Sequence, residues 1–273
     1  MAVMSRVFPP NVAGLFYPEE TEVLRGTVQA FLDQAASAPP IADLRALVAP
    51  HAGYIYSGRT AARAYALLRP LAPQIETVVM LGPAHRAPVF GAVLPAAGAF
   101  ATPLGEVPVN QELKLRLADA GLAAVQDRPF AGEHCLEVQL PFLQSVLGSF
   151  DLLPLLIGEA EPDEVSAVIS RAADVGRVLI VVSTDLSHFL SDSEARRVDA
   201  RTRALIEALD YENLRAEQAC GAAALRGLLH YARRQGLRAV TLDMTNSSTA
   251  SGDVERVVGY GAYAFFGGAG EHH

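Results

Sequence analysis

The chain has 273 residues, of which 51% are hydrophobic and 19% charged, a composition typical of a folded globular protein and not of a disordered one. Its formal net charge of −8, with lysine and arginine scattered in ones and twos, argues against a surface that binds nucleic acid or anionic lipid. Two cysteines do not make a disulfide framework, and neither a long apolar run nor a signal-peptide pattern is present, so we expect a cytoplasmic protein without membrane or nucleic-acid partners.

The first predicted element is an amphipathic helix. Pro18 favours a helix start, and Glu19 and Glu20 suit the positive end of the helix dipole. Apolar residues then recur on one face through residues 24–35, and the Pro39–Pro40 pair ends the pattern.

Beyond this helix, apolar runs typical of strands alternate with helical patterns. Several of the runs are continuously apolar, as in strands that helices cover on both faces. The predicted strands are residues 45–49, 76–81, 89–94, 152–157, 177–183, 238–244 and 257–265. The predicted helices are residues 57–68, 110–120, 136–147, 162–173, 193–209 and 221–235. The alternation predicts a three-layer α/β/α sandwich around a mostly parallel or mixed sheet.

Two prolines modify these elements. Pro154 falls within a predicted strand and suggests a sheet edge or a bulge, whereas Pro141 falls within a predicted helix and suggests a kink. At 273 residues one domain suffices, so we expect a single α/β domain over residues 1–266 followed by a flexible tail, residues 267–273, that we exclude from the chemistry.

Three histidines follow predicted strands by only a few residues. They are His51, His85 and His188. In open α/β sheets the functional crevice lies beyond the carboxyl ends of the parallel strands, so these imidazoles are expected to share one crevice. His134 precedes a predicted helix and can face the same edge, whereas His230 lies within a helix and is expected to pack or be solvated.

Imidazole is a common ligand of transition metals, and a carboxylate or thiolate often completes the set. The anionic candidates are Glu133, Glu137, Asp185, Asp243, Asp253 and Cys135, and the sequence does not choose among them. Asp185 stands three residues before His188, where it can orient the imidazole. Glu133 has the alternative role of favouring a helix start, and both Cys135 and Cys220 are interpreted as small buried hydrophobes.

Several ordered motifs resemble the Memo proteins, including component B of the AmmeMemoRadiSam system. They are residues 12–18 (VAGLFYP), 50–54 (PHAGY), 81–85 (LGPAH), 133–142 (EHCLEVQLPF), 183–188 (STDLSH) and 220–221 (CG). The resemblance implies a fold similar to class III extradiol dioxygenases, and a functional link to AMMECR1-like and radical-SAM proteins.

The resemblance also implies roles for individual residues. His51 and His85 would bind the metal, His188 would take the place of the general base with Asp185 nearby, and His134 would line the pocket. Animal Memo proteins use a late cysteine as third ligand, and our alignment puts Ala250 near that position, within a polar segment, residues 246–253, that contains no cysteine.

Three functions remain open at this point. The first is a metal-dependent redox enzyme, dioxygenase-like, that uses Fe²⁺ and acts on an unknown small-molecule or peptide-borne substrate; zinc and copper are the alternative metals. The second is a non-catalytic module that binds a metal or a peptide in the same crevice. The third is metal-assisted hydrolysis, in which the ion activates water.

Overall fold

A nine-stranded mixed sheet forms the centre of the computed structural model, which describes residues 6–35 and 41–267. In spatial order the strands are β10 (His188–Leu190), β12 (Val257–Gly267), β2 (Leu44–Ala49), β9 (Val178–Ser183), β3 (Thr77–Pro83), β8 (Asp151–Ile157), β4 (Ala92–Leu94) and β7 (Ala124–Val125), and β11 (Leu237–Asn246) pairs with β12. The four strands β2, β9, β3 and β8 are mutually parallel. Antiparallel pairings of β12 with β2 and of β4 with β8 make the sheet mixed.

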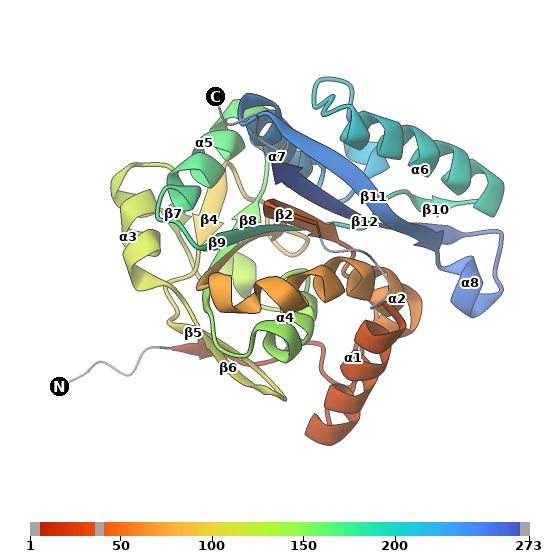
Figure 1. The fold of residues 1–273 in the computed structure, drawn as a ribbon, viewed down its shortest axis with the longest axis horizontal. Coiled ribbons are helices and arrows are strands. Elements are labelled where there is room, and N and C mark those ends of the chain that lie inside the picture. Colours follow the sequence, from red (N-terminus) through yellow and green to blue (C-terminus); the bar gives the residue numbers. More distant parts are fainter. Residues whose placement is uncertain (1–5, 36–40, 268–273) are drawn as a thin grey trace.

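Helices cover both faces of this sheet (Figure 1). One face carries α2 (Tyr54–Tyr65), the 3₁₀ helix η1 (Ala66–Gln74) and α4 (Leu140–Leu147), with α1 (Thr21–Ala35) packed against α2 and α4. The other face carries α3 (Gln111–Asp119), α5 (Pro162–Ala173), α6 (Asp192–Glu207) and α7 (Ala222–Arg234).

Alternate residues of a strand enter opposite cores, as the two-residue repeat of a strand requires. In β2, Leu47 and Ala49 join the core under α2 and α4, whereas Ala46 and Val48 join the core under α5 and α7. A strand buried on both sides must be apolar throughout, which is why these strands are continuous apolar runs in the sequence. The predicted three-layer sandwich is confirmed.

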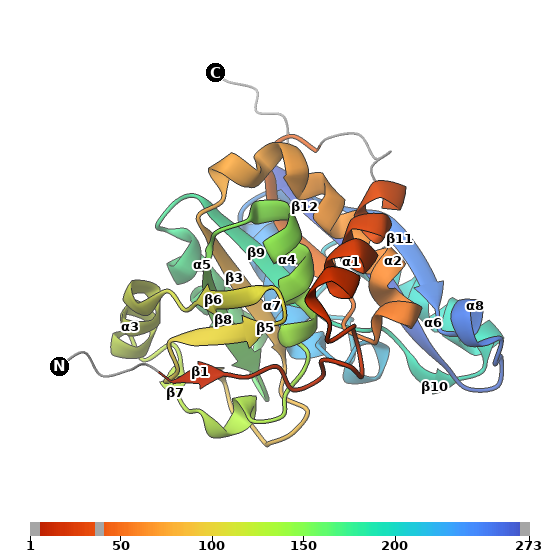
Figure 2. The ribbon, with the colours of Figure 1, turned by 90° about the horizontal axis from the view of Figure 1, so that it is seen from below.

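Short elements were not predicted from the sequence. A separate three-stranded sheet contains β1 (Val7–Phe8), β5 (Ala99–Thr102) and β6 (Gly105–Pro108), and β6 lies beside β8 (Figure 2). Other short elements outside the predicted ones are β7, β10, η2 (Arg128–Phe130), η4 (Ala216–Gln218) and α8 (Ser248–Ser251), whereas η3 (Glu137–Gln139) lies within the helix predicted over residues 136–147. Segments of two to four residues are too short to display a hydrophobic period.

The structure corrects three interpretations of proline. The first helix begins at Thr21 and not at Pro18. Pro141 does not kink a helix, because α4 begins at Leu140 and the proline lies in its first turn, where its missing N–H costs no bond. Pro154 lies in β8, an interior strand that pairs with β3 without a register shift. On its other side β8 is bridged by Val109 at Leu152 and paired with β4 at residues 156–157.

The two ends of the predicted domain are only partly described. Gly267 ends β12 and therefore belongs to the sheet and not to the predicted tail. Residues 268–273 and the Pro39–Pro40 pair lie outside the described residues. Among the helices that the structure describes, none has the length and apolar character needed to cross a bilayer.

Candidate metal site

The strand order brings His51 and His85, two of the three strand-end histidines, to one edge of the sheet. β2, β9 and β3 are adjacent and parallel, with Ala49 opposite Ser183 and Leu81 opposite Val182. His51 follows β2 and His85 follows β3, while Asp185 follows β9 between them. Because the carboxyl ends of neighbouring parallel strands lie together, segments far apart in the sequence converge here.

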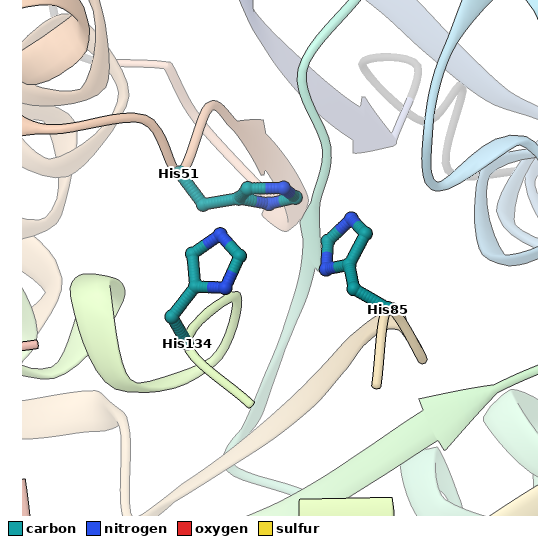
Figure 3. A group of neighbouring side chains, drawn as sticks. All are labelled: His51, His85 and His134. Atoms are coloured by element: carbon teal, nitrogen blue, oxygen red, sulfur yellow. The ribbon is translucent and has the colours of Figure 1, made fainter. Parts of the chain in front are cut away.

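Three imidazoles face one another at this edge (Figure 3). Their ring centroids are separated by 5.3 Å for His51 and His85, 5.5 Å for His51 and His134, and 5.1 Å for His85 and His134. One ring nitrogen from each lies within 4.8 Å of the other two. Two ligands about 2.1 Å from one ion are at most about 4.2 Å apart, so small side-chain movements suffice to seat a metal ion.

His51 is buried and held on several sides. Its backbone N–H donates to Asp185 Oδ1 (2.8 Å), its Nδ1 lies 2.9 Å from Ser183 Oγ, and its Nε2 lies 3.4 Å from Cys220 Sγ. Burial, aided by the nearby His85, lowers the pKa of His51 to about 3. The ring is therefore neutral at physiological pH, the form that a metal requires.

Glu133 holds His85 from two directions. Its carboxylate accepts the backbone N–H of His85 at 2.6 Å and Nδ1–H at 3.0 Å. The backbone N–H groups of His134 and Cys135 also donate to it. Burial alone raises the pKa of Glu133, but the hydrogen bonds from His85 and Cys135 outweigh it and lower the pKa to about 2. A carboxylate accepts and never donates, so Nδ1 of His85 carries the proton and Nε2 is free to bind a metal.

His134 is placed differently from the other two imidazoles. Its ring packs edge-on against Phe16, with centroids 4.9 Å apart. Its buried Nδ1 lies 3.3 Å from Glu133 Oε1 but makes no hydrogen bond with any described residue. Burial and the nearby His51 lower the pKa of His134 to about 4. The ring is within reach of a shared ion, yet no acceptor fixes its tautomer.

The structure revises the expected relation between Asp185 and His188. His188, the first residue of β10, is oriented by the carbonyl oxygen of Leu186, 2.7 Å from its Nδ1. Asp185 makes no hydrogen bond to His188 among the described residues and instead holds the backbone of His51. Burial raises the pKa of Asp185 to about 6, although the His51 N–H opposes this shift. Because Leu186 accepts the Nδ1 proton, Nε2 of His188 is available to accept another.

Cys220 lies beside His51, a neighbour that the sequence interpretation missed, although among the described residues it belongs to no group of possible metal ligands. It immediately precedes the Gly221 N-cap of α7, and its sulfur faces Nε2 of His51. A thiolate about 2.3 Å and an imidazole nitrogen about 2.0 Å from one tetrahedral ion lie roughly 3.5 Å apart, close to the observed 3.4 Å. Ala250, the position aligned with the late family cysteine, is instead an exposed residue of α8. The paired motif of Cys220 and Gly221 was the only sequence signal for this residue.

The other anionic candidates have structural partners. Glu137 accepts backbone N–H groups of Asn11 and Val12 and the hydroxyl of Tyr17, which fixes the segment that carries Phe16. The Cys135 thiol donates to the carbonyl of Pro83, and burial raises its pKa well above the usual value. Although His85, Glu133 and Cys135 also form a compact group, Glu133 is occupied by four N–H donors.

The remaining candidates have partners of their own. Asp243 accepts a hydrogen bond from Thr60, and Asp253 accepts one from the backbone of Glu255. His230, in α7, packs edge-on against Tyr211 at 4.8 Å. None of these residues belongs to the groups of possible metal ligands found among the described residues.

The sequence profile of the Memo-like protein family matches residues 9–264. The chain belongs to the Memo family. A MEMO1 family protein of Archaeoglobus fulgidus is 34% identical over 270 residues, covering 94% of this chain and 98% of the relative. A MEMO1 family protein of Methanosarcina acetivorans is 35% identical, covering 93% of this chain and 97% of the relative. One of Thermoplasma acidophilum is 34% identical, covering 92% of this chain and 96% of the relative. An uncharacterized Escherichia coli K12 protein of known structure shares 14% identity, with a TM-score of 0.47 over 80% of this chain and 99% of its own.

The Memo-like motifs surround the imidazoles. Residues 12–18 bring Phe16 against His134, and residues 133–142 supply Glu133, which holds His85. Residues 183–188 and 220–221 place Ser183, Asp185 and Cys220 around His51. The segments that carry the family resemblance therefore meet at one site, although they are distributed over most of the chain.

Proposed function

We propose that this Memo-family protein binds one transition-metal ion, iron(II) in the first instance, through His51 and His85. The Cys220 thiolate, beside Nε2 of His51, is the proposed third ligand and must move toward His85 on binding. The observation that carries the proposal is the opposed pair of imidazoles whose Nδ1 atoms are both engaged, by Ser183 and by Glu133, while the rings stand 5.3 Å apart. Metal-binding histidines almost always engage the second ring nitrogen in this way.

The donor set fits such an ion. Imidazole and thiolate ligands suit iron, zinc and copper and do not suit magnesium or calcium, which take oxygen ligands. His134 lies within reach of the same ion but lacks the supporting hydrogen bond of the other two, so we assign it to the wall of the pocket. His85 keeps 30% of its side-chain surface exposed, which leaves the site open to a substrate.

We further propose a dioxygenase-like redox reaction on a substrate of unknown identity. A bound iron(II) ion would supply a site at which dioxygen or a substrate oxygen is polarised. His188 would accept a proton at Nε2, because Leu186 holds its other nitrogen. Asp185 would hold the His51 backbone in place while the substrate enters.

Metal analysis of protein purified without chelators tests this proposal. We expect about one equivalent of iron, together with oxygen consumption on catechol substrates. Bound zinc without oxygen chemistry would favour metal-assisted hydrolysis, and a protein that takes up no metal would favour the non-catalytic module.

Single substitutions test the ligands. His51→Ala and His85→Ala are each expected to abolish metal loading while the circular dichroism spectrum is retained. His230→Ala is the matched control. This histidine of α7 packs against Tyr211 and lies outside the group of three imidazoles. Full metal content in both site variants would show that the ligand assignment is wrong.

A further inference from the structure

A chain of buried polar side chains leads from the core to His51. The hydroxyl of Tyr65, in α2, donates to Gln139 Oε1 at 2.7 Å, and Gln139 Nε2 donates to Ser183 Oγ at 2.8 Å. Ser183 Oγ in turn lies 2.9 Å from Nδ1 of His51. Tyr65, Gln139 and Ser183 are completely buried, so each of their polar atoms depends on these partners.

The bonds of Ser183 determine where the proton of His51 lies. A hydroxyl has one proton to donate and can accept two hydrogen bonds. Ser183 donates its proton to the carbonyl oxygen of Cys135, at 2.6 Å, and this oxygen can only accept. Gln139 Nε2 occupies one acceptor position of Ser183. The third contact of Ser183 Oγ, with Nδ1 of His51, is therefore a hydrogen bond only if Nδ1 carries the proton and donates it.

The orientation of the Gln139 amide is fixed independently of His51. Its Nε2 also donates to the carbonyl oxygen of Pro50 at 2.9 Å. A flipped amide would place Oε1 against this carbonyl oxygen and against Ser183 Oγ, whose proton is already committed to Cys135. Pro50 and Tyr65 therefore hold the nitrogen of Gln139 toward Ser183.

We infer that Gln139 and Ser183 are positioning residues that keep the proton of neutral His51 on Nδ1 and present Nε2 to the metal. The metal-binding consequence rests on the proposed function, whereas the position of the proton is a property of the chain itself. In free histidine the neutral ring prefers a proton on Nε2. The buried hydrogen bonds from Tyr65 to Ser183 thus reverse this preference in His51. They leave Nε2, the nitrogen that faces Cys220, without a proton.

His85 and His51 differ in the group that accepts the Nδ1 proton. His85 has its Nδ1 proton held by a charged acceptor, Glu133. His51 has its Nδ1 proton held by a neutral hydroxyl that two further residues lock in place. The nitrogen left without a proton is Nε2 in both rings, on a partly exposed residue in His85 and on a buried one in His51.

Long-range ¹H–¹⁵N correlation spectra of the metal-free, ¹⁵N-histidine-labelled protein at pH 7 test the position of the proton. We expect His51, assigned by loss of its signals in His51→Ala, to show a protonated Nδ1 and an unprotonated Nε2. A protonated Nε2 in the wild-type protein would overturn the inference. This experiment requires neither metal nor catalytic turnover.

Titration with cobalt(II) against a competing chelator tests the consequence for binding. Ser183→Ala removes the acceptor of the Nδ1 proton, and we expect cobalt affinity to fall roughly 10–100-fold, as for other supporting partners of metal ligands. Ser166→Ala, at a buried serine of α5 on the far face of the sheet, is the matched control and is expected to leave the affinity unchanged. Equal affinities of Ser183→Ala and wild type would overturn the positioning role.

Failure of this inference is distinguishable from failure of the proposed function. If wild-type protein binds no metal but its His51 carries the proton on Nδ1, the metal proposal fails and the proton assignment stands. If wild-type protein binds cobalt tightly but its His51 carries the proton on Nε2, the metal proposal stands and the role of Gln139 and Ser183 is wrong.

Discussion

The sulfur of Cys220 lies 3.4 Å from Nε2 of His51, although 169 positions separate the two residues in the chain. The contact joins the end of β2, a strand inside the sheet, to the start of α7, a helix that covers one of its faces. The same thiol contacts the backbone N–H of Asp185 at 3.3 Å, so the three segments are tied together at the candidate metal site.

Cys220→Ser is expected to weaken metal binding more than about 100-fold, because it removes a ligand and not merely a supporting partner. It should also eliminate the thiolate-to-metal charge-transfer absorption of the cobalt(II) protein. Burial raises the pKa of the metal-free thiol to about 12, so binding must displace its proton and the affinity should increase with pH.

Cys135→Ser is the matched control for Cys220. This second cysteine is completely buried and donates to the Pro83 carbonyl, so its replacement is expected to leave the charge-transfer band in place. If Cys220→Ser retains the band, the thiolate ligand is Cys135 and not Cys220. If the wild-type cobalt(II) protein shows no such band, the third ligand is not a thiolate, and His134 becomes the candidate.

The convergence of His51 and His85 was predictable because it follows from chain order. Alternating apolar runs and helical patterns predict parallel strands, and parallel strands place the residues that follow them at one edge. The prediction required no knowledge of side-chain contacts. It is therefore robust to errors of a few residues in the strand ends, such as the start of β4 at Ala92 instead of Val89.

The roles of Cys220 and Leu186 were not predictable in the same way. Cys220 precedes a helix and not a strand end, so no periodic pattern points it at His51. A backbone carbonyl such as that of Leu186 leaves no signal in residue type at all. Both contacts depend on how loops turn after β9 and before α7, and loop geometry is set by the assembled fold.

Glu133→Gln is expected to reduce the free energy of unfolding of the metal-free protein by about 2–3 kcal/mol near neutral pH. The Glu133 carboxylate accepts hydrogen bonds from four N–H groups, and an amide, with a single oxygen, cannot accept them all. The pKa of Glu133 is lowered from 4.5 to about 2, so its ionisation stabilises the fold fully above pH 4.5. That contribution disappears as the pH falls through about 2.

Urea denaturation of both proteins between pH 2 and 7 measures this difference. The wild-type protein should lose more stability than Glu133→Gln as the pH falls below 4.5. Parallel stability curves for the two proteins over the whole range would contradict a lowered pKa at Glu133.

Asp185→Asn is expected to have the opposite pH dependence. Burial raises the pKa of Asp185 from 3.8 to about 6, so the folded protein binds this proton more tightly than the unfolded chain. Wild-type stability should therefore fall as the pH rises from 3.8 to 6. The asparagine carbonyl still accepts the His51 N–H, so the variant should be more stable than wild type above pH 6, by up to about 2–3 kcal/mol. Urea denaturation of metal-free protein tests this, and a variant less stable than wild type at pH 7 would refute it.

Tyr65→Phe and Tyr263→Phe compare two completely buried tyrosines that differ in one respect. The Tyr65 hydroxyl donates to Gln139, whereas the Tyr263 hydroxyl makes no hydrogen bond to any described residue. Loss of the Tyr65 hydroxyl leaves Gln139 Oε1 buried without a donor, and we expect a loss of about 1–3 kcal/mol in the free energy of unfolding. Tyr263→Phe removes a hydroxyl that lacks a partner, so its stability should equal or exceed that of wild type. Urea midpoints provide the comparison, provided that the dependence of the unfolding free energy on urea concentration is the same in both variants. A Tyr65→Phe midpoint at or above that of Tyr263→Phe would show that the Tyr65–Gln139 hydrogen bond does not stabilise the core.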